Sequence, residues 1–225
     1  RKAVVEYPQG WLSEPIEHGG SRQAAWRVDS SVAGAGGCSG DIGVHAFNIL
    51  EFVTGLPAQR LIADLSSKPG RTLDDDCNVL LRLTGDVPAV LHASQIAAGA
   101  RNGLRLRVWG ESGGLDWSHE RPGELRVDRP DGSTTTLHAG AGILSSAGRA
   151  AGRLPPGHPE GFIEAFATIY RDVAAAVRDG RQPDGDLQGA AAGVRGMRFI
   201  DRAVQSSAEG RWLAFERAAT KGPGS

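Results

Sequence analysis

The sequence predicts an α+β domain in which helices pack on one face of a mainly antiparallel, open-faced β-sheet. Short runs with alternating apolar and polar residues fill the middle of the chain, as in Leu104–Trp109, and turn residues such as Gly110–Gly114 and Pro130–Gly132 separate them. Short turns join neighbouring strands in antiparallel order. After Glu160 the apolar residues recur at the spacing of amphipathic helices.

The expected elements follow in order along the chain. A first strand occupies Arg1–Tyr7, a helix runs from Asp41 to Gly55, and a last strand spans Arg211–Phe215. The strands expected between them are Arg60–Ser66, Asn78–Leu83, Ala89–Ile96, Leu104–Trp109, Leu115–Ser118, Glu124–Asp128 and Thr134–His138. Long helices are expected at Glu160–Arg178 and Leu187–Ser206, and the Gly/Ala/Ser-rich stretch Ala139–Gly152 is expected to be a mobile loop.

A glycine-dense loop, Gly34–Gly40, leads into the first helix, which carries Asp41 and His45 four residues apart. Residues at i and i+4 lie on one face of a helix, so both side chains are expected to point into the same space. The field of the first turn favours a carboxylate by roughly 0.3–1 kcal/mol and helps keep His45 neutral and able to accept a proton. The alternative is structural: Asp41 caps the helix and His45 is a buried, hydrogen-bonded histidine.

The run Gly40-Asp41-Ile42-Gly43-Val44-His45 resembles the D-x-G-x-H segment that opens a helix in the C-terminal domain of the Gfo/Idh/MocA oxidoreductases. Gln23–Arg27 before the loop, Glu51–Gly55 at the helix end and His158–Gly161 before the next long helix agree with that family in order and spacing. The resemblance covers nearly the whole chain. It is closest to the branch that acts on sugars, anhydrosugars and cyclitols.

The resemblance implies an NAD(P)-dependent dehydrogenase that acts on CH–OH donors. Hydride would pass between the nicotinamide and a secondary alcohol of a sugar or polyol, His45 would take the hydroxyl proton, and Asp41 would assist His45. Three further side chains are candidates for substrate binding: Arg27, His158 and Trp26. Gly36 and Gly37 are candidates for cofactor contact by proximity alone. The alternative function is a non-catalytic carbohydrate-binding or oligomerisation domain of the same fold.

Enzymes of this family begin with a nucleotide-binding domain that holds a Gly-rich phosphate loop and a lysine in a Glu-Lys-Pro motif, and this chain has neither. Its two near matches to G-x-G-x-x-G have serine, at Ser39 and Ser145, in place of the third glycine. We therefore expect residues 1–217 to form a C-terminal substrate-binding and oligomerisation domain, with 218–225 as a disordered tail. NAD or NADP is expected to bind mainly outside this chain, and the open sheet face is expected to form a homo-oligomer.

Composition argues against several other classes of partner. The net charge of −1 over 225 residues gives no reason to expect nucleic acid or a membrane surface as a partner. Cys38 and Cys77 lack metal-ligand spacing, and Asp74–Asp76 is typical of a solvated turn, so no metal is expected. Two cysteines without a disulfide pattern or signal peptide favour a reducing cytoplasm.

Overall fold

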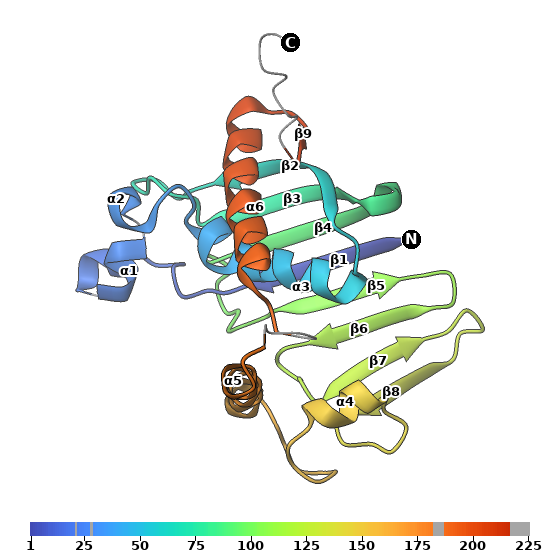
Figure 1. Cartoon of the computed structure of the whole chain (residues 1–225). Helices are drawn as coiled ribbons and strands as arrows, with labels where there is room; N and C mark the ends of the chain where they lie inside the picture. Colours follow the sequence, from blue (N-terminus) through green and yellow to red (C-terminus); the bar gives the residue numbers. More distant parts are fainter. Residues whose placement is uncertain (21, 28, 182–186, 217–225) are drawn as a thin grey trace, which may run out of the picture.

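The computed structural model describes residues 1–20, 22–27, 29–181 and 187–216 of the 225-residue chain. Residues 218–225, for which a disordered tail was expected, lie outside the described part. Figure 1 shows one broad sheet with helices against it, as the sequence predicts for an α+β domain.

The described strands form one nine-stranded sheet in the order β8-β7-β6-β5-β1-β4-β3-β2-β9. Their bounds are β1 Lys2–Pro8, β2 Ala58–Ser66, β3 Asp76–Leu83, β4 Val87–Ser94, β5 Arg105–Trp109, β6 Gly114–Ser118, β7 Glu124–Asp128, β8 Thr134–His138 and β9 Leu213–Ala214. Every pairing is antiparallel except that of β1 with β4. The predicted, mainly antiparallel sheet is confirmed.

The parallel pairing of β1 with β4 determines where the candidate site lies. Parallel strands end at the same edge of a sheet, and Tyr7 is paired with Ala93 and Pro8 with Ser94. The segment that follows β1 therefore leaves the sheet beside the segment that follows β4. Gln9 donates its backbone N–H to Ser94, and Leu12 donates to Gln95.

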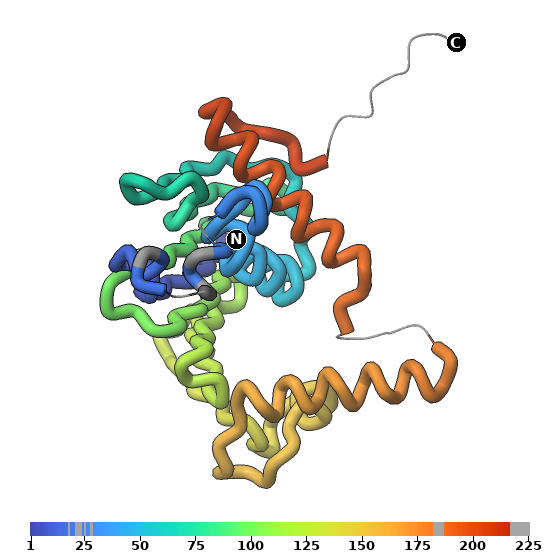
Figure 2. Tube along the Cα trace, turned by 90° about the vertical axis from the view of Figure 1, so that its left-hand side faces the viewer, coloured from blue at the N-terminus to red at the C-terminus, as the bar shows by residue number. Residues whose placement is uncertain are grey.

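Helices and shorter helical turns lie between the strands and after them. The helices are α1 Arg22–Arg27, α2 Ser30–Ala33, α3 Val44–Thr54, α4 Ser146–Ala151, α5 Phe162–Arg178 and α6 Ala190–Glu209. The helical turns are η1 Ile16–Gly19, η2 Ser39–Gly43 and η3 Thr84–Asp86. Figure 1 shows α3 and α6 against one face of the sheet, and the tube in Figure 2 shows the same arrangement turned by 90°.

The core lies between α3, α6 and the central strands. The ring of Phe47 on α3 stacks on Phe199 of α6, with centroids 4.6 Å apart, and on Phe215, with centroids 5.3 Å apart. All three rings are fully buried. Gly196 allows α6 to approach α3 closely, because a Cβ there would lie 2.8 Å from Val44. The core fixes the position of α3 and thus of His45 near its start.

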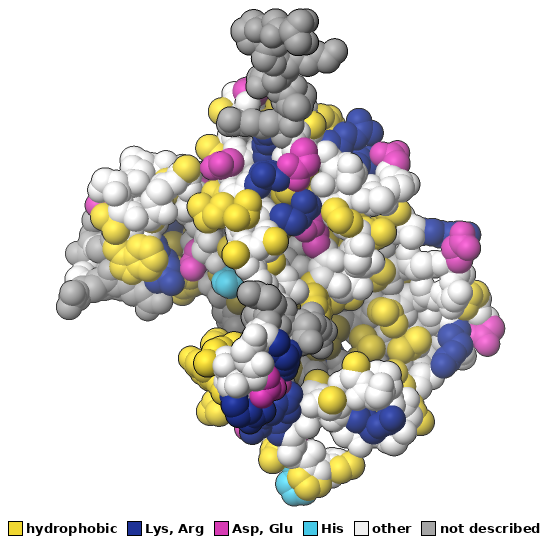
Figure 3. Space-filling model, in the orientation of Figure 1, with side chains coloured by type: hydrophobic (Ala, Val, Ile, Leu, Met, Phe, Trp, Pro, Cys, Tyr) yellow, Lys and Arg dark blue, Asp and Glu magenta, His cyan; other side chains and the backbone are white. Residues whose placement is uncertain are grey.

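Helix α5 departs from the expected packing. Its apolar residues recur with helical spacing, yet Phe162, Ile163, Tyr170 and Val177 are 66%, 76%, 69% and 77% exposed. Figure 2 shows α5 projecting from the rest of the chain, and Figure 3, in which α5 is seen end-on, shows hydrophobic side chains on one side of it. The helical period is confirmed, but the sheet does not cover this apolar face.

The Gly/Ala/Ser-rich stretch Ala139–Gly152 is not a plain loop. It contains α4, which Ser145 caps by accepting a hydrogen bond from the N–H of Gly148 at 3.1 Å. The Ser145 hydroxyl thus supplies the acceptor for the first turn of this helix, which the composition of the segment alone does not indicate. Among all the helices in the described residues, none is long and apolar enough to cross a membrane.

Candidate functional site

The helix that carries Asp41 and His45 starts from a buried loop held by Asp74. The Asp74 carboxylate accepts the backbone N–H of Gly37 at 2.7 Å and that of Ser39 at 2.6 Å, and its carbonyl accepts the N–H of Cys38 at 2.6 Å. The first N–H groups of a helix need acceptors, and here a distant segment supplies them. Asp74 thus caps this helical turn, and the prediction that Asp74–Asp76 is a solvated turn is wrong.

Burial raises the pKa of the Asp74 carboxyl, although the hydrogen bonds from Ser39 and Gly37 oppose that shift. Its neighbour Asp75 is also buried, with 2% of its surface exposed. Both residues therefore belong to the interior of the site. A sequence of three acids does not reveal this, because the hydrogen-bond donors come from segments far away in the chain.

The loop glycines Gly36 and Gly37 pack against the protein itself. A Cβ on Gly37 would lie 2.2 Å from the Asp74 carbonyl oxygen, and one on Gly36 would lie 2.8 Å from Ile200. Both residues are buried. The close approach that glycine permits is thus to neighbouring chain segments. The cofactor contact expected of these two glycines stays a prediction.

Asp41 lies in a π-helical turn, η2, that continues directly into α3. The N–H of Val44 donates to the carbonyl of Ser39, five residues back, which is the π pattern and is frequent at functional sites. The Asp41 carboxylate accepts Arg27 Nε at 3.0 Å and Gln95 Nε2 at 2.7 Å, both at Oδ2. Arg27 Nη2 reaches Oδ1 at 3.4 Å. Arg27 is therefore paired with Asp41.

His45 follows Asp41 by one turn and is exposed. This excludes the alternative in which His45 is a buried core residue. No hydrogen bond joins Asp41 to His45 within the described residues, because the Asp41 carboxylate faces Arg27 and Gln95. The two side chains nevertheless line one pocket, so the predicted common space is present and the predicted direct support of His45 by Asp41 is not.

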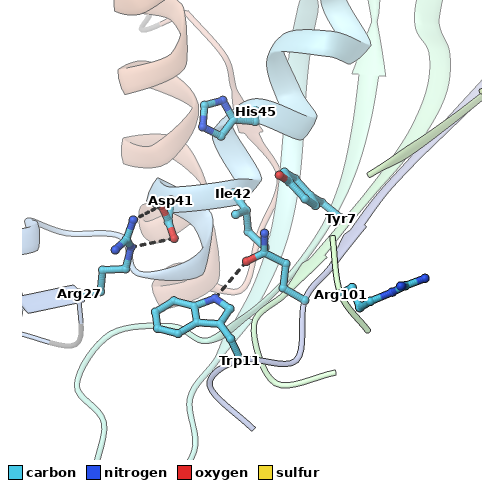
Figure 4. A pocket seen from close by; sticks show the side chains of 8 residues that line it. Tyr7, Trp11, Arg27, Asp41, Ile42, His45 and Arg101 are labelled. Carbon is cyan, nitrogen blue, oxygen red and sulfur yellow. Dashed lines mark hydrogen bonds and ion pairs between the residues drawn. The ribbon is translucent and has the colours of Figure 1, made fainter. Parts of the chain in front are cut away.

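The pocket has a volume of about 410 Å³ and is mostly polar in its lining. It is lined by Tyr7, Gln9, Trp11, Arg27, Asp41, Ile42, His45 and Arg101. Figure 4 shows the Tyr7 hydroxyl pointing toward the space between Asp41 and His45. Burial, and next the charge of Asp41, raise the pKa of Tyr7, so its hydroxyl remains protonated at neutral pH. The site thus presents hydrogen-bond donors and acceptors around a small space.

A second set of contacts fixes the aromatic wall. Trp11 donates its indole N–H to Gln9 Oε1 at 3.0 Å, and Gln9 Nε2 donates to Asn102 Oδ1 at 2.9 Å. The guanidinium carbon of Arg27 lies 5.7 Å from the centroid of Trp11 and 4.5 Å from that of Trp26. Such cation–π contacts orient Arg27 toward Asp41.

Two predicted substrate-binding residues do not line this pocket. Trp26 is 45% exposed and supports Arg27 through its ring. His158 lies in the turn before α5, where its Nδ1 is 3.2 Å from the carbonyl oxygen of Pro155. Proximity in a sequence motif did not indicate which residues turn toward the pocket. Trp11, not Trp26, contributes the ring at its wall.

Sequence reasoning missed Tyr7, Gln9, Gln95 and Arg101. Tyr7, Gln9 and Trp11 alternate at the end of the first strand, and that period of two was an available signal for three side chains on one side. Gln95 carries no such signal, because it follows β4 and meets Asp41 of η2 only in three dimensions. In the described part of the chain no cluster of potential ligands could hold a metal ion. Burial raises the pKa of Cys38 far above its usual range.

Comparisons with known proteins find relatives of this chain. The profile described as the GFO/IDH/MocA C-terminal domain matches residues 1–116. An uncharacterized oxidoreductase, YfiI of Bacillus subtilis (strain 168), is 27% identical over 226 residues, which cover 96% of this chain and 58% of that protein.

Solved structures give the same result. An inositol dehydrogenase homolog from Azotobacter vinelandii, complexed with NAD⁺, has a TM-score of 0.87 and 29% identity over 95% of this chain. An oxidoreductase from Sinorhizobium meliloti has a TM-score of 0.81 and 36% identity over 95% of this chain. The chain spans 57% and 56% of those two chains, so it corresponds to little more than half of each.

Proposed function

Because the chain belongs to the Gfo/Idh/MocA family of oxidoreductases, we propose that it is the substrate-binding portion of an NAD(P)-dependent dehydrogenase. Its substrate would be a secondary alcohol of a sugar, anhydrosugar or cyclitol. Residues 1–217 would form that portion, and the open sheet face would join two copies. The observation that carries the proposal is an exposed histidine, His45, in one pocket with a clamped carboxylate, Asp41.

A polyol suits the lining of this pocket. Trp11 offers a ring face for the C–H surface of a sugar or cyclitol, and Tyr7 and Gln9 offer groups for its hydroxyls. A relative supports the choice of a cyclitol: the Azotobacter vinelandii inositol dehydrogenase homolog, 28% identical in this comparison, has been solved with NADH and myo-inositol. Myo-inositol is therefore the first substrate to test.

The described residues do not form a cradle for a dinucleotide. The glycines that could approach a phosphate, Gly36 and Gly37, are occupied by contacts with Asp74, Leu73 and Ile200. A nicotinamide bound mainly outside the described residues would supply the hydride acceptor for the carbinol carbon. The residues of this chain act on the alcohol and its proton.

His45 would accept the hydroxyl proton as the carbon loses hydride. An imidazole is suited to act as a general base at neutral pH. Asp41 would not hold the imidazole directly, because its oxygens bind Arg27 and Gln95. Its remaining role is to accept a substrate hydroxyl and to place negative charge near the imidazolium that forms. The clamp keeps the carboxylate from turning away.

The proposal is tested by His45→Ala in the complete enzyme that carries this chain. We expect kcat with myo-inositol and NAD⁺ to fall about 10²–10⁴-fold, the usual contribution of a general base, with a smaller change in KM. The melting temperature should stay close to that of the wild type, because His45 is exposed. His138→Ala, a change of another exposed histidine on β8, serves as the matched control.

Near-normal turnover in His45→Ala would remove the case for this site. If the wild-type enzyme binds polyols but no variant or condition gives turnover, the alternative of a non-catalytic carbohydrate-binding domain gains support. Steady-state kinetics and polyol binding by calorimetry, measured on the same preparations, separate these two outcomes.

A further inference from the structure

We propose that Asp74 and Asp75 are positioning residues that hold the two walls of the pocket against each other. The helix wall consists of η2 and the start of α3, with Asp41, Ile42 and His45. The strand wall is the segment 7–17, with Tyr7, Gln9 and Trp11. This inference rests on the function proposed above, in which one wall handles the proton and the other contacts the polyol.

Asp74 fixes the helix wall. Three consecutive N–H groups, those of Gly37, Cys38 and Ser39, donate to its carboxylate or its carbonyl at 2.6–2.7 Å. The Ser39 hydroxyl adds a fourth bond at 3.1 Å. These bonds fix the backbone only two residues before Asp41. Rotation or translation of this turn would move Asp41 and His45 together, because both belong to the continuous helix that follows.

Asp75 fixes the strand wall through Arg71. Asp75 Oδ2 accepts Arg71 Nη1 at 3.0 Å, and the two side chains are 2% and 4% exposed. The same guanidinium binds both Glu17 oxygens, at 2.9 and 3.1 Å, and the Leu12 carbonyl at 2.9 Å. Arg71 therefore holds the chain at Leu12 and Glu17, both within the segment 7–17. Bidentate, buried contacts of this kind hold geometry tightly.

Gln95 joins the two walls. Its backbone N–H donates to the carbonyl of Asp75 at 2.9 Å, and its own carbonyl accepts the N–H of Leu12 at 2.9 Å. Its side chain, which is 2% exposed, donates to Asp41 at 2.7 Å. Asp74 and Asp75 are adjacent in the chain, so one dipeptide makes the contacts that hold both walls. A shift of this dipeptide would alter the distance between the polyol and the proton acceptor, His45.

The two acids should affect kinetics differently. Loosening the helix wall misplaces His45 and Asp41, and misplacement by about 1 Å can cost on the order of 10²-fold in rate. Loosening the strand wall weakens ground-state contacts with the polyol, which raises KM with little change in kcat. A purely structural role would lower the fraction of folded enzyme and leave both constants of the folded molecules unchanged.

The test uses the complete enzyme with myo-inositol and NAD⁺ as probes. For Asp74→Asn we expect kcat to fall about 10-fold with KM within about 2-fold of wild type. For Asp75→Asn, which weakens the ion pair of Asp75 with Arg71, we expect KM to rise about 5-fold at nearly unchanged kcat. Glu17→Gln weakens the hold of Arg71 from the other side and should have the same effect. Asp76→Asn is the matched control: its carboxylate accepts the Asn78 amide, and both constants should stay at wild type.

Hydrogen–deuterium exchange on the same proteins provides a readout that does not depend on activity. Asp74→Asn should speed exchange in residues 37–45 and leave 9–17 unchanged, and Glu17→Gln should do the reverse. If Asp74→Asn does not fold, Ser39→Ala removes only the 3.1 Å bond and should shift kcat and exchange in the same direction by less.

Wild-type kcat and KM in Asp74→Asn and Glu17→Gln, despite faster local exchange, would overturn the inference. Faster exchange spread evenly over the chain would also contradict it, because the two walls would then not be held separately. If the wild-type enzyme turns over no polyol, the proposed function fails. The segment-specific exchange pattern still decides whether the two acids hold two walls.

Discussion

At the scale of single residues, the polar contacts of the pocket converge on the carboxylate of Asp41. Arg27 balances it from one side and the Gln95 amide from another, and Arg27 is itself held between two indole rings. The pair is partly exposed, 20% at Arg27 and 29% at Asp41, so solvent screens part of its attraction. The arrangement contributes more to geometry than to stability, and its charge still reaches the Tyr7 hydroxyl.

Asp41→Asn should lower the pKa of Tyr7. Burial is the largest cause of the raised value and persists in the variant, whereas the negative charge that disfavours the phenolate is removed. The Tyr7 pKa should therefore fall relative to the wild type. NMR titration of protein labelled with ¹³C at the tyrosine ring measures this, and Tyr7→Phe assigns the resonance.

Asp29→Asn is the control for that titration, since Asp29 caps α2 and is exposed. It should leave the Tyr7 pKa unchanged. An unchanged Tyr7 pKa in Asp41→Asn would mean that the charge of Asp41 does not act on the hydroxyl, and the electrostatic description of the pocket would then be wrong.

The same residues show what a sequence can and cannot predict here. Asp41 and His45 were identifiable because helical spacing alone places them on one side of one element. Arg27 was identified as a candidate by its place in the motif, but its partner was not, because a side chain on α1 meets η2 only in three dimensions. Asp74 was misjudged for the same reason: its donors lie 35 and 37 residues away.

At the scale of elements, the strands were predictable and the packing of the helices was less so. Alternation predicted Glu124–Asp128 and Thr134–His138 with the bounds that the structure has. The same pattern cannot say which helix covers which strand. Helix α5 has the expected apolar period, yet that face is exposed. The turn from loop to helix at Gly37 is local in the sequence, but its geometry depends on contacts with Asp74 and Leu73.

Gly37→Ala should destabilise the fold strongly. Its Cβ would lie 2.2 Å from the backbone oxygen of Asp74 and 2.9 Å from Leu73, and backbone cannot move aside cheaply. We expect a loss of about 3 kcal/mol in the free energy of unfolding, at the upper end for overpacking. Thermal and urea unfolding measure it.

Gly193→Ala is the matched change for comparison. Gly193 lies within α6, and a Cβ there meets nothing within 4 Å. We expect it to stabilise by ~0.5–1 kcal/mol, because alanine favours helix more than glycine does. Equal effects of the two substitutions would contradict the view that Gly37 is required by a close approach of two segments.

At the scale of the whole molecule, the face of the sheet opposite α3 and α6 is half apolar and half charged. One row of paired residues crosses it in the order Ile62, Leu80, Val90, Val4, Arg107, Asp116, Arg126 and Thr136. Leu80 is 49% exposed at the apolar end of the row. Exposed apolar strips with a polar margin are typical of interfaces between subunits. This pattern supports the proposed dimer through the open face.

Leu80→Asp should therefore weaken the dimer and leave the fold intact. In a two-fold interface the same patch serves both subunits, so each dimer would contain the new carboxylate twice, desolvated against apolar neighbours. We expect the dimer dissociation constant to rise at least about 10-fold, equal to about 1.4 kcal/mol. Sedimentation velocity over a range of concentrations measures it. Ile143→Asp is the matched control, because Ile143 is 73% exposed outside the sheet and should not change assembly. A monomer at all concentrations for the wild type, or equal assembly of Leu80→Asp and the wild type, would assign the apolar half of this face to another partner.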